Sequence, residues 1–164
     1  MMGADHRLAA IRRWLLGISA FLFVGTIGEL IMLKHYDGTM QLLPFALCAI
    51  GFLGVALLSL ARSPRLILGT RVVMILIAAS SLIGVWEHIE GNTGFEKELH
   101  PHATTTELVK AALTGRDPLM APGILAVAAL IAIVASVAVS EERRPSHQPQ
   151  VISRIAPSGA GYRR

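Results

Sequence analysis

Charged side chains are scarce in this chain of 164 residues: only 16% are Asp, Glu, Lys or Arg, while 53% are hydrophobic. Charged residues make up roughly a quarter of a typical soluble domain, so the shortage argues against an ordinary soluble domain. The mean hydropathy is correspondingly positive, at +0.58. The length suits one compact unit rather than two. We therefore expect an integral membrane protein that has the lipid bilayer as its first partner.

Aromatic residues and cysteine are also few. Aromatic side chains make up 5% of the chain, which argues against a platform for stacked bases. The net charge of +4 would suit nucleic acid, but the basic residues lie at the ends of apolar runs, so we expect no nucleic acid partner. The single cysteine, Cys48, lies inside such a run and cannot form an internal disulfide. We interpret it as a packing residue.

Four apolar runs are long enough to cross a bilayer, for which about 20 residues are needed. They cover residues 14–33, 42–61, 66–86 and 119–139. Helix is the state in which such runs satisfy their own backbone hydrogen bonds in lipid. The sequence thus predicts an all-α integral membrane protein, an antiparallel bundle of four transmembrane helices within residues 1–140. Arg71, inside the third run, is expected to snorkel toward the near interface.

The distribution of basic residues predicts the direction of the spans, because cytoplasmic flanks are enriched in Lys and Arg. With both termini cytoplasmic, that side holds eleven basic residues and the outer side four, namely Lys34, Lys97, Lys110 and Arg116. Eight of the eleven acidic residues lie on the outer side. The Ala, Gly and Arg-rich composition favours a bacterial inner (cytoplasmic) membrane.

The first span has a second interpretation, as a cleaved secretory signal. Arg12 and Arg13 precede an apolar run, and residues 25–28 include small side chains. Cleavage would leave three spans and an outer N-terminus near Glu29. No A-x-A site precedes that position and the run is long for a signal, so we favour a retained span.

Two segments lie outside the predicted spans. Residues 141–164 are polar and rich in Pro, Ser, Gly and Arg, which predicts a disordered cytoplasmic tail. The outer loop, residues 89–117, contains Thr104 and Glu107 at the spacing of a capping box, followed by Leu108, Leu113 and Gly115. We expect a short amphipathic helix there, lying on the outer membrane surface.

Small residues recur at helical spacing within the spans and predict where helices approach one another. The first span carries Gly17, Gly25 and Gly28, the second Gly51 and Gly54, and the third Ser80 and Gly84. The fourth carries four small residues at intervals of four: Ala128, Ala132, Ser136 and Ser140.

The first candidate site is a carboxylate near the outer end of the first span. Glu29 in its ionised form would cost several kcal/mol in hydrocarbon without a partner or water. Ser80, Gly84 and His88 share one face of the third helix, so the small stripe leads to an imidazole at a similar depth. We expect Glu29 and His88 to meet inside the mouth of the bundle.

The second candidate is a run of acids and imidazoles in the outer loop. In an extended segment Glu96, Glu98, His100 and His102 would share one side, and Pro101 favours an extended His100. Imidazole with carboxylate suits Zn, Cu, Ni or Fe, so we predict a divalent transition metal at the outer mouth. Its candidate ligands are Glu29, His35, His88, Glu90, Glu96, Glu98, His100 and His102. The competing interpretation is a solvated polar surface, since no H-E-x-x-H or C-x-x-C spacing occurs.

Three functions follow from these features. The leading hypothesis is a protein that acts by binding, an accessory or assembly subunit with a membrane-protein partner or a second copy of itself. The first alternative is a small proton-coupled or metal-ion transporter that uses Glu29; Cys48 is the only ionisable residue in spans two and four, which argues against a polar path. The second is a membrane enzyme with a His/carboxylate metal centre. No G-x-S-x-G motif occurs, and we assign no catalytic residue.

Overall fold

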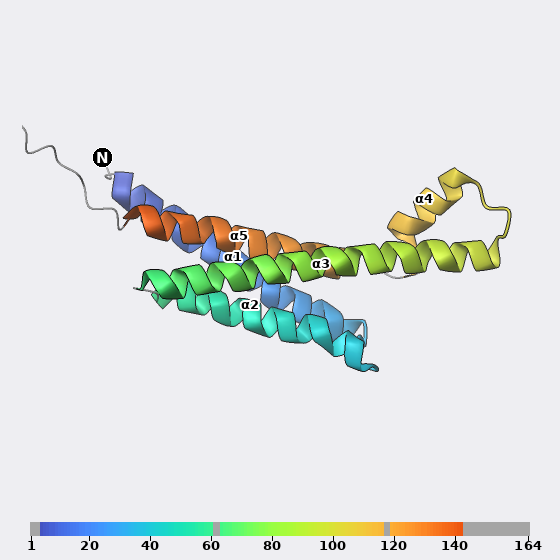
Figure 1. Cartoon of the computed structure of the whole chain (residues 1–164), viewed down its shortest axis with the longest axis horizontal. Coiled ribbons are helices and arrows are strands. Elements are labelled where there is room, and N and C mark those ends of the chain that lie inside the picture. The colour runs from blue at the N-terminus through green and yellow to red at the C-terminus, as the bar shows by residue number, and fades with distance from the viewer. Residues whose placement is uncertain (1–3, 61–62, 117–118, 143–164) are drawn as a thin grey trace, which may run out of the picture.

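The computed structural model describes residues 4–60, 63–116 and 119–142, and every regular element within them is a helix (Figure 1). The elements are α1 (Ala4–Met32), the short 3-10 helix η1 (Thr39–Leu42), α2 (Leu43–Leu60), α3 (Pro64–Leu99), α4 (Thr105–Thr114) and α5 (Met120–Glu142). Four stretches, in α1, η1 with α2, α3 and α5, are long and apolar enough to span a membrane. The chain is therefore an integral membrane protein, as predicted. Apart from Glu141 and Glu142 in α5, the predicted tail lies outside the described residues.

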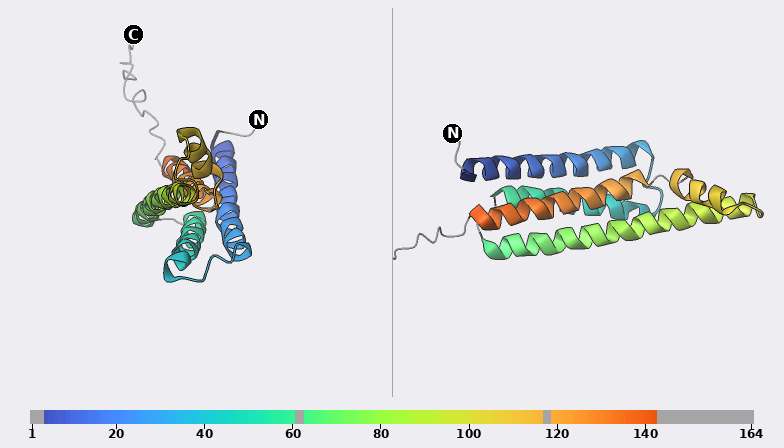
Figure 2. Two further views of the ribbon diagram at one scale, coloured as in Figure 1. Left: turned by 90° about the vertical axis from the view of Figure 1, so that its right-hand side faces the viewer. Right: turned by 90° about the horizontal axis from the view of Figure 1, so that it is seen from above.

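The four long helices form an antiparallel bundle (Figures 1 and 2). α1 contacts α2 and α5, and α3 contacts the same two helices, so the order around the bundle is α1, α2, α3, α5. α1 and α3 begin at the end where α2 and α5 finish. We call this the arginine-rich end, because Arg7, Arg12, Arg13 and Arg65 lie there. The opposite end, beside α4, is the α4 end.

α5 forms the centre of the packed core through alanine. Ala128, Ala129, Ala132 and Ala135 are fully buried, and small side chains let the α1 and α3 backbones come close. A hydroxyl adds a polar link, because Ser19 Oγ of α1 donates a hydrogen bond of 2.8 Å to the Ala128 carbonyl. The predicted stripe on the fourth span is confirmed at Ala128, Ala132 and Ser136; the side chain of Ser140 lies outside the described part.

The glycines of the second span are packing positions, as predicted, and those of the first are not. A Cβ added at Gly51 would lie 2.4 Å from the ring of Phe23 in α1. Gly17, Gly25 and Gly28 are exposed, and a Cβ at each would meet no atom within 4 Å. The prediction for the first span is therefore wrong. α1 instead turns its larger side chains to the core, at Leu16, Ser19, Phe23, Thr26 and Leu30.

Arg71 is hydrogen-bonded to α5, and its predicted extension toward the interface stays a prediction. Its Nε donates to Ser136 Oγ at 2.6 Å and its Nη2 to the Ser136 carbonyl at 2.7 Å. Ser136 is fully buried in α5. A guanidinium in a span needs acceptors, and α5 presents two at the right depth. The arginine-rich end is thus tied together by a charge-assisted link between α3 and α5.

The third span continues far beyond its predicted end at Trp86. α3 has 36 residues, about 54 Å at the rise of an α-helix, whereas the hydrocarbon core is roughly 30 Å thick. α4 folds back onto the last turns of α3 (Figure 1). Asn92 is buried between them, and its Nδ2 donates to the Ala112 carbonyl at 3.4 Å. The predicted outer loop is therefore largely a helical hairpin, which we call the α3–α4 hairpin (residues 87–116).

Candidate functional site

A cavity of about 550 Å³ opens at the α4 end, between α1, α2, α3 and α5. Its walls are mostly apolar and include Leu30 from α1, Leu47 from α2 and Leu125 from α5. α3 and α5 approach closely beside it, since a Cβ on Gly84 would lie 3.3 Å from the Cβ of Pro122. α2 makes few contacts with α5. The space therefore lies between α2 and α5, which face each other across the bundle.

Polar side chains from three parts of the chain reach this cavity. They come from the α1–α2 connection, from α3 and from the segment after α4: His35, Gln41, Ser80, Ser81, Glu87, His88 and Arg116. The predicted face of Ser80, Gly84 and His88 is confirmed as a single wall of the cavity. A mostly apolar cavity with a few convergent polar groups is the usual form of a small-molecule site.

His88 carries an unsatisfied nitrogen. Its Nδ1 is enclosed and has no hydrogen-bond partner among the described residues. A buried polar atom without a partner costs free energy, and native structures contain few. In neutral imidazole this nitrogen either donates or accepts, depending on the tautomer. A ligand group that reached this nitrogen would gain a hydrogen bond that none of the described residues makes.

His35 is placed by the way α1 ends. The His35 N–H donates to the Leu30 carbonyl at 2.9 Å and the Lys34 N–H to the Ile31 carbonyl at 3.0 Å. This is the Schellman pattern of a helix C-terminus. It requires a left-handed residue, which here is Lys34 with a φ of 53°. The turn reverses the chain and brings His35 to the cavity wall.

Glu29 is not brought to His88. It is half-buried in α1 and does not line the cavity, and within the described ranges the two side chains form neither a hydrogen bond nor an ion pair. The neighbouring Leu30, 2% exposed, is the side chain that α1 turns into the bundle. Adjacent residues on a helix point about 100° apart. Glu29 is therefore rotated away, and the predicted meeting is wrong.

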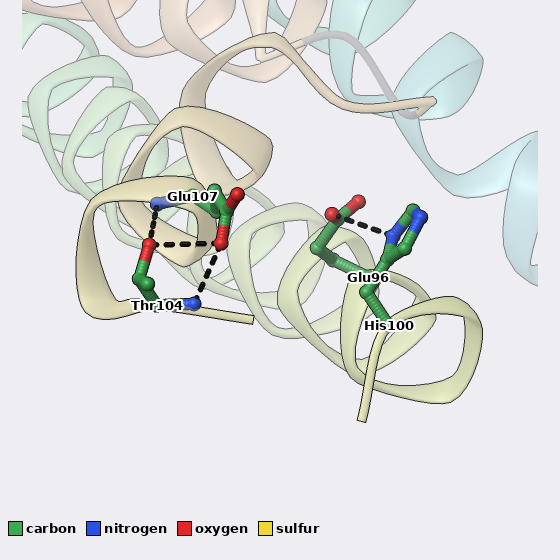
Figure 3. Close-up of polar contacts among 4 residues, drawn as sticks. All are labelled: Glu96, His100, Thr104 and Glu107. Atoms are coloured by element: carbon green, nitrogen blue, oxygen red, sulfur yellow. Dashed lines mark hydrogen bonds and ion pairs between the residues drawn. The ribbon is translucent and has the colours of Figure 1, made fainter. Parts of the chain in front are cut away.

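The predicted extended segment is also wrong, because residues 96–99 are the last turn of α3 (Figure 3). Glu96 Oε1 and His100 Nδ1 lie 3.0 Å apart, one helical turn along. The His100 N–H donates to the Glu96 carbonyl at 2.8 Å and ends the helix. Glu98, two positions after Glu96, points about 200° away around the helix. The four side chains therefore do not share one side.

No three His, Cys, Asp or Glu residues in the described ranges form a group that could hold a metal ion. Of the eight predicted ligands, His35 and His88 line the cavity, and Glu96 pairs with His100 in the hairpin. The other four join neither place: Glu29, Glu90, Glu98 and His102. A transition metal at this end stays a prediction without a preformed ligand set.

The capping box is confirmed and fixes the start of α4 (Figure 3). The Thr104 N–H donates to Glu107 Oε2 at 2.7 Å, and Thr104 Oγ1 donates to the same oxygen at 2.8 Å. The backbone hydrogen bond, then the hydroxyl one, lowers the pKa of Glu107 because both favour the ionised carboxylate. α4 packs on α3 rather than lying alone; its predicted place on the membrane surface stays a prediction.

Four polar cavity residues were not singled out from the sequence, namely Gln41, Ser81, Glu87 and Arg116. Arg116 was counted only as an outer positive charge, and Gln41 carried no signal because it lies in a short connection. Both reach the cavity through turns, Gln41 in η1 and Arg116 after Gly115. The Gly115 backbone passes so close to Asn92 that a Cβ there would lie 2.6 Å from its side chain. The sequence analysis interpreted Gly115 only as the end of a helix. A glycine at this point could also have indicated the close turn that brings Arg116 to the cavity.

The chain matches no protein-family model, no curated protein and no solved structure. Its geometry therefore carries the functional argument.

Proposed function

We propose that this small polytopic membrane protein acts by binding, as an accessory or assembly subunit of a larger membrane complex. We also propose that its cavity at the α4 end holds a small amphiphilic ligand. One observation carries the ligand proposal: a cavity of about 550 Å³ is lined by His88, whose buried Nδ1 has no partner among the described residues. The volume lies within the range of roughly 300–1,000 Å³ for small-molecule sites.

The charge distribution supports placing the α4 end outside the cytoplasm. In the predicted topology, eleven of the fifteen basic residues lie on the side that contains the arginine-rich end. Such an excess of basic residues is typical of cytoplasmic flanks. The cavity then opens near the outer membrane interface. A ligand can reach it from the outer leaflet or from the outer aqueous phase.

The lining supports an amphiphile with an uncharged polar group. Leucines of α1, α2 and α5 provide an apolar surface that can contact the apolar part of the ligand. At the polar side, Glu87 and Arg116 have opposite charges, so neither an anion nor a cation is clearly preferred. A hydroxyl can both donate and accept, and so suits either tautomer of His88, while a carbonyl suits the tautomer with Nδ1–H.

The α3–α4 hairpin supports the subunit role. Four large apolar side chains are at least 43% exposed on it, Phe95, Leu99, Val109 and Leu113. α3 is about 54 Å long and the hydrocarbon core is roughly 30 Å thick, so much of the hairpin would extend into water if α3 crosses the bilayer. Apolar residues gathered on a surface that faces water are typical of protein contacts. We propose a membrane-protein partner with an extramembrane part at that height.

Native mass spectrometry of the full chain, extracted in mild detergent, tests the ligand proposal. The expected result is a retained small molecule that is lost in His88→Ala and in Ser80→Leu, which fills the cavity. His102→Ala is the matched control, because His102 is exposed and does not line the cavity. The ligand proposal is wrong if the molecule stays bound in both cavity variants.

Co-purification tests the subunit role. We expect a defined partner that is captured by wild type and by Lys97→Glu but lost in Leu99→Glu, since Lys97 and Leu99 are both exposed in the last turn of α3. A complex that contains only this chain would point to self-association and would contradict the accessory role. Transport through Glu29 and a metal-centre enzyme stay predictions, because neither gains support from the arrangement of the described residues.

A further inference from the structure

A second hollow, of about 450 Å³, lies between α1 and α2 at the arginine-rich end. Arg12 and Arg13 flank it on α1, and Ser59 lies in the last turn of α2. Small side chains create the space: a Cβ on Gly17 would meet no atom within 4 Å, and Ala56 faces it from α2. This hollow, which we call the α1–α2 groove, is unrelated to the cavity at the α4 end.

The groove combines an apolar channel with a basic end. Its apolar lining runs along both helices, with Leu16, Gly17 and Ala20 on α1 and Phe52, Val55 and Ala56 on α2. None of the nine described residues that line it is acidic. Guanidinium groups bind phosphate oxygens with paired hydrogen bonds. The chemistry that fits is therefore a long apolar chain joined to a phosphate.

The depth of the arginines agrees with a lipid headgroup. Arg12 and Arg13 line the groove together with Ser59, which is in the last turn of α2, so they lie near the end of an apolar span, where a headgroup would lie. Arg12 is half-buried while Arg13 is exposed, so the pair presents charge both within the groove and at its mouth. Basic pockets between helices on the cytoplasmic side are typical sites for anionic lipid headgroups.

We infer that the α1–α2 groove binds an anionic phospholipid of the leaflet at the arginine-rich end. The phosphate contacts Arg12 and Arg13, and one acyl chain lies along Gly17 and Ala56. The inference is independent of the proposed function, because it uses no residue of the α4-end cavity.

The charge is tested by lipid exchange on the full chain in nanodiscs that contain phosphatidylglycerol and phosphatidylcholine, followed by native mass spectrometry. Wild type is expected to retain phosphatidylglycerol. Each basic residue near an anionic surface is worth roughly fivefold in binding, so Arg12→Gln with Arg13→Gln should lower the preference by about 25-fold. Arg65→Gln, an exposed arginine at the same end but outside the groove, is the control and should change it little.

The groove itself is tested without changing charge. Gly17→Leu fills the space and should remove the retained phospholipid, whereas Gly25→Leu, equally open but on another part of α1, should keep it. Circular dichroism and thermal unfolding of each variant confirm that the bundle is intact. Retention of phosphatidylglycerol in Gly17→Leu, or an unchanged preference in the double arginine variant, would overturn the inference. So would a dimer of the chain that covers the groove.

Discussion

The two ends of the bundle are built from the same four helices but solve opposite problems. At the arginine-rich end, Arg71 of α3 is held by the hydroxyl and carbonyl of Ser136, and small residues of α5 close the core. At the α4 end, the helices leave a cavity lined by His88, whose Nδ1 has no hydrogen-bond partner within the described part of the chain. The difference is one of packing: the core beside Arg71 is closed, whereas the α4 end leaves a cavity with several polar side chains in its wall.

The same substitution made at both ends is the strongest test of this difference in packing. Ser136→Leu adds bulk to a closed core and removes the hydroxyl that Arg71 contacts, so it should lower the free energy of unfolding by about 3 kcal/mol or more. The leucine in Ser80→Leu enters the cavity, so this variant should change the free energy of unfolding by less than about 1 kcal/mol. Reversible unfolding in mixed micelles measures both, and equal losses would contradict the contrast between the ends.

A second comparison concerns the middle of the bundle. Gly51→Ala places a methyl group 2.4 Å from the rigid ring of Phe23, and should cost about 2 kcal/mol in the range known for overpacked cores. Gly54→Ala meets the flexible end of Met74 at 2.5 Å, which can turn aside, so its cost should be clearly smaller. The same unfolding assay ranks them. The reverse order would mean that α1 and α2 pack differently.

At the α4 end, loss of a cap should act locally. Thr104→Ala removes the side-chain oxygen that caps α4 and should weaken that helix by about 1 kcal/mol, the usual effect of removing such a cap. Hydrogen exchange should become faster in residues 105–114 and stay unchanged in α5. If α5 exchanged faster as well, the hairpin would not be an independent unit.

The smallest expected effect is the pH dependence of the same helix. The folded-state pKa of Glu107 lies below its ordinary value of 4.5. The cap is therefore fully present above that ordinary value and is lost as the pH falls through the lowered pKa. Exchange in α4, corrected for intrinsic rates, should rise only on acidification. In Glu107→Gln this dependence should vanish; its persistence would assign it to another group.

Local features of the sequence predicted the spans and the α4 cap because hydropathy and capping act over a few residues. The face of Ser80, Gly84 and His88 was predictable for the same reason, since helical spacing alone fixes it. The rotation of α1 was not predictable. Lipid and core are equally apolar, so the pattern does not say whether Gly17 or Ser19 turns inward. The wrong placement of Glu29 follows from this ambiguity.

The extension of α3 was hidden for a different reason. Gly91, Asn92, Thr93 and Gly94 are poor helix formers, so local propensity does not favour helix in this part of the predicted loop. Packing against α4, with the buried Asn92 between the helices, overrides that propensity. The link from Arg71 to Ser136 needed knowledge of which helices are neighbours, which no single span provides. Contacts distant in the chain were therefore the part that sequence reasoning missed.

Thiol accessibility tests the central claim, that the α4-end cavity is open and outward while the α5 core beside Arg71 is closed. Ser80→Cys and Ser136→Cys are matched variants, and the native Cys48 is fully buried. A membrane-impermeant methanethiosulfonate added outside intact cells should modify Ser80→Cys and leave Ser136→Cys unmodified. Modification of Ser80→Cys only after the membrane is permeabilised, or equal protection of both variants, would contradict the account.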